Sequence, residues 1–187
     1  MVPAVNTLSV RQEIQHISDW ATDNNLKLNS SKSREMIVHL PHKRKYFSYP
    51  TPVPGIERVE KMHILGITVS STLTFHHHIS DLVAKTARSM YALKTIRAHG
   101  LNRNELWDVT RATLVSQLLY TSPAWWGYLK ADETNRLQSI IKKAIRYGYL
   151  PRSFCTLGEL SEDSDDKLFF STMYSSNHVL HRLLSQT

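Results

Sequence analysis

The side chains best suited to bind a metal are concentrated in a run of three histidines. His76, His77 and His78 are consecutive in the sequence, and consecutive positions of a helix point about 100° apart. Histidine pairs that bind zinc from one helix are instead spaced four residues apart. The sequence therefore predicts no metal site at this run.

Two other groups of reactive type lack the partners that chemistry requires. Cys155 has no histidine near it in the sequence to activate its thiol, so we expect it to be inert. As the single cysteine it excludes an internal disulfide and suits a reducing compartment. The acidic run EDSDD at 162–166 has the ligands for a cation, but it is more typical of a solvated helix flank.

Positive charge is the chemical feature that extends over most of the chain. The 187 residues include 23 Lys and Arg, 16 Asp and Glu and 10 His, a formal net charge of +7. Residues 1–150 hold 20 basic against 11 acidic side chains, whereas residues 151–187 hold three against five. A basic body of this kind suits a polyanionic partner, and it also suits a surface whose charge serves solubility alone.

The apolar residues do not suggest a membrane protein. No run reaches the roughly 18 apolar residues that a membrane-spanning helix needs, and the N-terminus lacks the pattern of a secretory signal. We therefore expect no membrane partner and an intracellular protein, in the cytoplasm or the nucleus. The HKRK cluster at 42–45 is a weak nuclear signal.

Helical spacing of apolar residues predicts the elements that position these side chains. The expected helices span 9–24, 75–99, 102–122, 132–147 and 156–173. Their predicted N-caps are Ser9 with Gln12, Asn102 with Glu105, Asp132, and Thr156 with Glu159. Asn24–Asn25, Gly100 and Gly148 are the expected stops.

Three short stretches, 35–40, 56–59 and 63–69, are typical of strands. Gly66 interrupts the last one, and a glycine inside a strand usually marks a bulge or a close backbone approach. The predicted fold class is α+β, with a small, mostly antiparallel sheet and one helix followed by an α-helical bundle. We divide the chain into residues 1–70, 71–150 and 151–187.

Residues 20–38, WATDNNLKLNSSKSREMIV, resemble motif D of reverse transcriptases, especially those of LINE-like, non-LTR retrotransposons. The stretch HILGITVSSTLTFHHHI at 63–79 resembles motif E of the same family, with Ile64 where phenylalanine is usual. The helical remainder, including SQLLYTSPAWWG and NRLQSIIKKAIRYGYLP, resembles the thumb and the region after it. The resemblance implies a palm remnant at 1–70, a thumb-like region at 71–150 and a C-terminal extension at 151–187.

The resemblance assigns roles to two residues of the palm remnant. Motif D would place Lys32 beside the incoming nucleotide, where its ammonium neutralises a phosphate or donates a proton to the pyrophosphate leaving group. The alternative is a solvated lysine in a polar turn. Motif E is the hairpin that grips the primer end, where Gly66 would let the backbone approach nucleic acid.

A thumb helix lies along the template–primer backbone in this family, which makes several basic residues candidate phosphate contacts. They are Lys85, Arg88, Lys142, Lys143 and Arg146. The alternative for each is a solvated helix face. Trp125, Trp126 and Tyr128 have the chemistry to stack on bases, but aromatic residues just after a helix more often pack in a core.

The resemblance also implies which groups the reaction needs. Template-directed nucleotide addition uses two Mg²⁺ ions held by aspartates of motif A and of a YADD or FADD hairpin, which precede motif D in this family. Only 19 residues precede Trp20, and Asp165–Asp166 lies in a helical context far downstream. We therefore expect no cofactor in this chain and no catalysis by it alone.

The function predicted on this basis is that of a fragment of an RNA-directed DNA polymerase. The partners implied for the parent enzyme are RNA and DNA as template–primer, together with the missing N-terminal part of the polymerase. Two alternatives stay open. One is a non-catalytic, basic nucleic-acid-binding module, and the other is a decayed reading frame without function.

Overall fold

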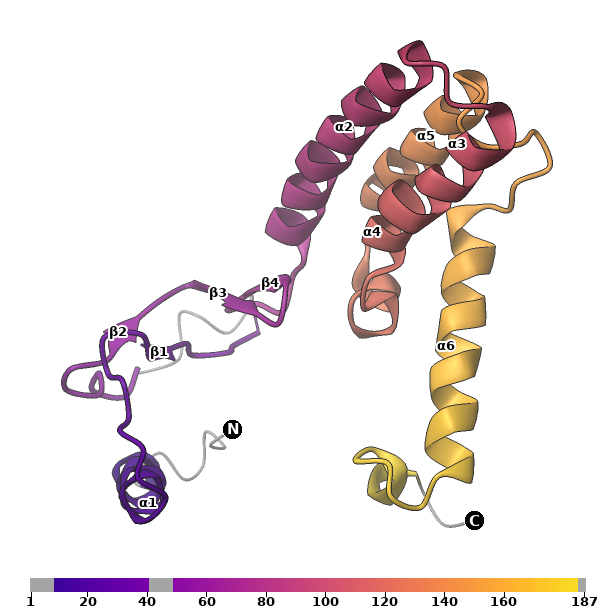
Figure 1. Ribbon diagram of the computed structural model, residues 1–187. Helices are drawn as coiled ribbons and strands as arrows, with labels where there is room; N and C mark the ends of the chain where they lie inside the picture. Colours follow the sequence, from indigo (N-terminus) through magenta and orange to yellow (C-terminus); the bar gives the residue numbers. More distant parts are fainter. Residues whose placement is uncertain (1–8, 41–48, 185–187) are drawn as a thin grey trace. The chain divides into compact units, whose positions relative to one another are not determined.

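A computed structural model describes residues 9–40 and 49–184 of the chain (Figure 1). The chain divides into two compact units, Met1–Thr74 and Phe75–Thr187. The first contains one helix and four short strands among its described residues, and the second is helical. The predicted α+β class is confirmed. The HKRK cluster at 42–45 lies outside the described residues, and the division of the sequence at residues 70 and 150 stays a prediction.

Helix α1 (Val10–Asp23) opens the first unit and buries Ala21. It ends as expected, because Asn24 is the C-cap and Asn25 adopts a left-handed conformation with φ of 56°. The predicted capping box of Ser9 with Gln12 is wrong. Ser9 has helical backbone angles and makes no side-chain capping hydrogen bond, whereas a capping serine needs an extended backbone.

The strands pair as two separate two-stranded ladders and not as one sheet. Strand β1 (Arg34–Glu35) pairs in parallel with β2 (Glu57–Arg58), and β3 (Lys61–Ile64) pairs antiparallel with β4 (Ile67–Ser70). Strand β1 stops at Glu35, although alternation of apolar residues predicted a strand to Leu40. Alternation alone does not supply a pairing partner, and the one ladder that includes β1 is two residues long.

Gly66 forms a turn, so the expectation of a bulge within one strand is wrong. Leu65 and Gly66 connect β3 to β4 with φ of 47° and 88°, and Ile64 pairs with Ile67 across them. Two-residue hairpin turns in which both residues have positive φ match the twist of the flanking strands. The run 61–70 is therefore a β-hairpin.

The second unit is a helical bundle whose two longest helices are α2 (His76–Ala98) and α6 (Leu157–Tyr174). Between them lie α3 (Arg103–Thr110), the π-helix η3 (Arg111–Val115), α4 (Ser116–Leu119), the 3₁₀ turns η4 (Ser122–Ala124) and η5 (Trp126–Tyr128), and α5 (Ala131–Arg146). A last 3₁₀ turn is η6 (His181–Leu183). The predicted helix 102–122 thus changes to π geometry midway.

The core of this unit lies where α2 packs against α5 and where α6 packs against η4 and α4. Its fully buried side chains come from every long helix, namely Ile79, Leu93, Leu114, Leu118, Trp125, Leu137, Ile141 and Leu157. No helix among the described residues is long and apolar enough to cross a membrane.

The helix ends test the predicted caps. Asn102 accepts a hydrogen bond from the Glu105 amide at 3.0 Å, and Thr156 and Glu159 form the expected capping box. The predicted Asp132 cap is wrong, because the N-cap of α5 is Lys130, two residues earlier, and Asp132 lies in the first turn of the helix. The Glu133 carboxylate accepts the Lys130 amide at 3.0 Å.

Candidate nucleic-acid interface

The turn that holds Lys32 is organised by Asn29. The Asn29 side-chain oxygen accepts hydrogen bonds from the Ser31 hydroxyl at 2.7 Å and from the Lys32 amide at 3.2 Å. The Ser33 hydroxyl donates to the Asn29 carbonyl at 2.9 Å. The polar turn is therefore present as predicted, and it leaves Lys32 exposed. The sequence signal for Asn29 was available, since asparagine side chains commonly organise turns of this kind.

Two ion pairs follow this turn and hold β1 to β2. Arg34 contacts Glu57 at 3.0 Å, and Arg58 contacts Glu35 at 2.7 Å. The second pair is more buried, and Glu35 also accepts the Val53 amide at 3.2 Å. Glu35 is thus committed to structure. The described residues contain no group of three or more His, Cys, Asp or Glu side chains arranged to hold a metal.

The hairpin β3–β4 presents its turn to solvent. Leu65 is 85% exposed, and Gly66 is exposed as well. A backbone turn of this kind is open to a close approach by another molecule. Contact of Gly66 with nucleic acid stays a prediction.

The basic candidates of the second unit lie on two helices that pack together. Lys85 and Arg88 are exposed on α2, and Lys142, Lys143 and Arg146 are exposed on α5. Lys142 and Arg146 are four residues apart, so they lie one turn apart on the same helix surface. Of the five, Arg146 has a described contact, with its guanidinium 5.0 Å from the centre of the Tyr147 ring.

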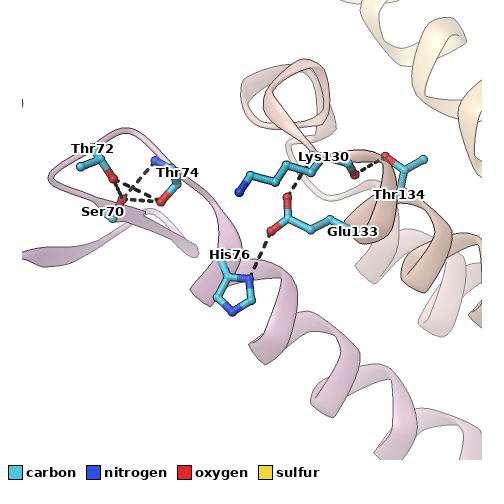
Figure 2. Close-up of polar contacts among 7 residues, drawn as sticks. All are labelled: Ser70, Thr72, Thr74, His76, Lys130, Glu133 and Thr134. Carbon is cyan, nitrogen blue, oxygen red and sulfur yellow. Dashed lines mark hydrogen bonds and ion pairs between the residues drawn. The ribbon is translucent and has the colours of Figure 1, made fainter. Parts of the chain in front are cut away.

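The side chains of His76 and His78 have separate structural roles. His76 Nδ1 lies 3.3 Å from Glu133 Oε1 in the second unit (Figure 2). His78 is buried, with its ring 5.3 Å from that of Trp125. In the first unit, Ser70, Thr72 and Thr74 form their own hydroxyl cluster, also drawn in Figure 2. The polar residues in and around the histidine run therefore have structural roles: His76 and His78 contact other side chains of the helical unit, and the hydroxyl groups stabilise a turn.

Trp125 packs in the core, as predicted for the aromatic segment. It is completely buried, and its indole nitrogen donates to the Tyr120 carbonyl at 3.0 Å. Tyr128 is 68% exposed, although its ring lies 5.6 Å from that of Phe75. Base stacking by Trp125 is therefore excluded in this structure.

Sequence reasoning missed three arginines that line a cavity together with Arg146. They are Arg97, Arg103 and Arg152. A signal was present in the sequence, because Arg97 and Arg103 flank the helix stop at Gly100, and Arg146 and Arg152 flank the stop at Gly148. The sequence did not show that the two stops meet.

Two curated proteins from retrotransposons are similar to this chain. One is a "Probable RNA-directed DNA polymerase from transposon X-element" of Drosophila melanogaster, 28% identical over 139 residues. The other is a "Retrovirus-related Pol polyprotein from type-1 retrotransposable element R1 2" of Nasonia vitripennis, 24% identical over 152 residues. The chain is distantly related to non-LTR retrotransposon reverse transcriptases.

The similarity extends over most of the chain but only part of each relative. It covers 69% and 75% of this chain, against 14% of the Drosophila protein and 36% of the Nasonia protein. No model of a known protein family matches the chain, and no solved structure does. The predicted family likeness is confirmed at this distant level, whereas the assignment of motifs D and E stays a prediction.

For a relative of these polymerases, the candidate residues divide into two kinds. Lys85, Arg88 and the basic residues of α5 need only a phosphate partner to act. Lys32 would act in nucleotide addition, which also requires carboxylates that hold metal ions. The described residues include exposed basic side chains on two helices, and they include no group of three or more His, Cys, Asp or Glu side chains arranged to hold a metal.

Proposed function

We propose that this chain is the portion of a non-LTR retrotransposon reverse transcriptase that begins at motif D, and that its helical unit binds nucleic acid. The parent reaction is RNA-templated DNA synthesis. The distant similarity over most of the chain is the observation that carries this proposal. Within it, the first unit contributes the end of the palm, and the second contributes the thumb and a C-terminal extension.

The charges of the second unit support the binding role. Its five basic candidates are exposed on α2 and α5, and none of them is ion-paired with a carboxylate in the described part of the chain. Lys167 differs, because its ammonium is paired with Asp163 at 2.5 Å on the acidic helix α6. Positive charge that is not neutralised by neighbours is available to phosphate groups.

The proposed role of Lys32 depends on groups from elsewhere in the polymerase. Mg²⁺ ions would supply charge stabilisation at the phosphoryl group, but the carboxylates of the described residues do not fit such a site. Glu35, three residues after Lys32, is held by Arg58 and the Val53 amide. Lys32 would then serve as a cation that contacts the nucleotide phosphates from an exposed turn.

A salt titration tests the binding role. A labelled RNA–DNA duplex is titrated with the chain at several salt concentrations, and fluorescence anisotropy gives the affinity. The double variant K142A/K143A is expected to lower the slope of log affinity against log salt by up to about 1.8, since each phosphate contact contributes about 0.9. The control K167A is expected to leave the slope unchanged. Absence of binding by the wild type at low salt would refute the proposal.

A primer-extension assay tests the expectation that the chain does not catalyse the reaction alone. The purified chain is supplied with template–primer, deoxynucleoside triphosphates and either Mg²⁺ or Mn²⁺. No extension is expected, because the described residues lack a metal-holding carboxylate group. Clear incorporation of nucleotides that scales with the concentration of the chain would contradict this part of the proposal.

A further inference from the structure

A cavity of about 810 Å³ in the second unit is lined by four arginines. Arg97 comes from the end of α2, Arg103 from the start of α3, Arg146 from the end of α5 and Arg152 from the turn after it. Neither aspartate nor glutamate is among the residues that line it. The cavity therefore concentrates positive charge where three helix ends meet.

Two of the four arginines have a structural explanation. Arg97 donates to the Tyr147 carbonyl at 2.5 Å, and its guanidinium lies 5.0 Å from the centre of the Tyr149 ring. Arg146 lies over the Tyr147 ring and donates to its hydroxyl at 3.2 Å. Cations near the C-terminus of a helix also interact favourably with its dipole. Arg97 and Arg146 thus stabilise the end of α5.

Arg103 and Arg152 have no comparable structural contacts that would account for their positions at the cavity. Both are exposed, and neither is ion-paired with a carboxylate among the described residues. Arg103 is the first residue of α3, where the helix dipole is positive and a cation is unfavourable. Four guanidinium groups around one cavity repel one another, and an anion between them would lower that repulsion further than solvent alone does. The arrangement therefore favours a bound anion.

Phosphate is the anion that this lining suits best. The planar guanidinium group forms paired hydrogen bonds with phosphate oxygens. The cavity also has aromatic walls, Trp107 and Tyr147, and proteins that bind single strands combine basic grooves with aromatic surfaces on which bases stack. A rigid double helix presents its phosphates along its outside, so it does not place a nucleotide within a cavity of this size.

We propose that this arginine cavity binds the phosphates of an unpaired nucleic-acid strand, with one or two nucleotides inside it. The proposal rests on the proposed function, because it assigns a specific site to the nucleic-acid binding of the helical unit. It adds Arg103 and Arg152 as contacts, which lie outside the basic faces of α2 and α5 discussed above. The strand is DNA or RNA, and these have the same phosphate chemistry.

The test compares two double variants of the full chain. R103A/R152A removes the two cavity arginines whose side chains make no hydrogen bond, ion pair or ring contact among the described residues. R136A/R182A is the control, because it removes the same charge from exposed positions of the same unit that do not line the cavity. Binding of labelled 20-nucleotide oligo(dT), oligo(rU) and a DNA duplex is measured by anisotropy over a range of salt.

We expect R103A/R152A to bind the single strands about tenfold more weakly, with a salt slope lower by about 1.4, since each single-strand phosphate contributes about 0.7. Its affinity for the duplex, and the affinities of the control for all three probes, should change less than twofold. The melting temperature of R103A alone should not fall, because alanine removes a cation from the positive end of α3. This separates lost binding from lost folding.

Several outcomes overturn the inference. Equal losses in the two double variants, equal losses for single strand and duplex, or no loss at all would each exclude the cavity as a single-strand site. Pyrophosphate binding to the wild type as tightly as the oligonucleotides would assign the cavity to isolated phosphates and not to a strand. The proposed function would survive these results, and it fails separately if the wild type binds none of the nucleic-acid probes.

Discussion

Replacement of Gly148 by alanine would place an L-residue in a left-handed backbone conformation without causing a steric clash. Gly148 follows α5 with φ of +75°, and a Cβ built on it meets no atom within 4 Å. The Gly148 amide donates to the Ile145 carbonyl at 3.0 Å, and the Tyr149 amide donates to the Ala144 carbonyl at 2.8 Å. This is the hydrogen-bond pattern in which a left-handed residue ends a helix. The glycine is therefore needed for its conformation alone.

Gly127 supplies a matched control in the same unit. A Cβ on Gly127 also meets nothing within 4 Å, but its φ is not in the left-handed region. In both variants alanine restricts the unfolded chain, which raises the free energy of unfolding by roughly 0.4–1 kcal/mol. G148A additionally incurs the left-handed conformation of an L-residue, about 1–2 kcal/mol. We expect G127A to be slightly more stable than the wild type and G148A to be about 1–2 kcal/mol less stable than G127A.

Urea unfolding followed by tryptophan fluorescence measures this difference. Trp125 is completely buried in the second unit, so its emission reports on the loss of that core. With a slope of about 2 kcal/mol per molar urea, a difference of about 1.5 kcal/mol separates the two midpoints by about 0.7 M. Equal midpoints for G148A and G127A would refute the argument that Gly148 is required by its backbone conformation.

Three further changes test other parts of the structure. S161A should raise the free energy of unfolding by about 1 kcal/mol in urea melts, since the Ser161 hydroxyl is fully buried without a hydrogen-bond partner among the described residues; a lower midpoint would contradict this. Hydrogen bonds from the Thr156 amide and hydroxyl lower the pKa of Glu159 below its ordinary 4.5, so their stabilisation is complete above pH 4.5 and is lost as pH falls through the lowered pKa. The stability advantage of the wild type over E159Q should therefore shrink below pH 4.5, and an advantage that does not depend on pH would refute the contact. L65N should slow amide exchange in β3–β4, because asparagine followed by Gly66 suits a turn with two positive φ angles; unchanged exchange would argue against strain at Leu65.

The features predicted correctly from the sequence depend on short-range contacts. Thr156 and Glu159 are three residues apart, and the side chain of each accepts a hydrogen bond from the backbone amide of the other. The same holds for Asn102 with the Glu105 amide. Helix stops at Asn25 and Gly148 follow from residues that tolerate positive φ. Local chemistry is sufficient to specify such ends, which is why most helix bounds were close.

The features that could not be predicted depend on contacts between distant residues. Strand β1 is held to β2 by Glu35 and Arg58, which are 23 residues apart. The apolar Leu65 predicts a strand that continues through the β3–β4 turn, because leucine is an unfavourable residue at the positive φ that this turn requires. The backbone preference of Leu65 differs from its conformation in the structure, so the apolar pattern of the sequence could not locate the turn.

The arginine cavity also depends on contacts between distant residues, so it could not be predicted from the sequence. Arg97 reaches the Tyr147 carbonyl across 50 residues, and Trp107 reaches the Gly148 carbonyl across 41. These two hydrogen bonds hold the end of α5 against the end of α2 and against α3. They place Arg103 and Arg152 around one space, although the sequence shows only isolated basic residues beside two helix stops.

The two candidate chemistries of this chain therefore call for different experiments. The proposed phosphate binding by the second unit would use side chains of that unit alone, with Arg103 and Arg152 lining one cavity, so it can be tested on the chain itself. Catalysis through Lys32 requires metal-holding carboxylates, and the described residues offer no such group. A failure of primer extension would thus leave the role of Lys32 to be tested in a longer polymerase, whereas a failure of strand binding by this chain would count directly against the helical unit as a nucleic-acid-binding part.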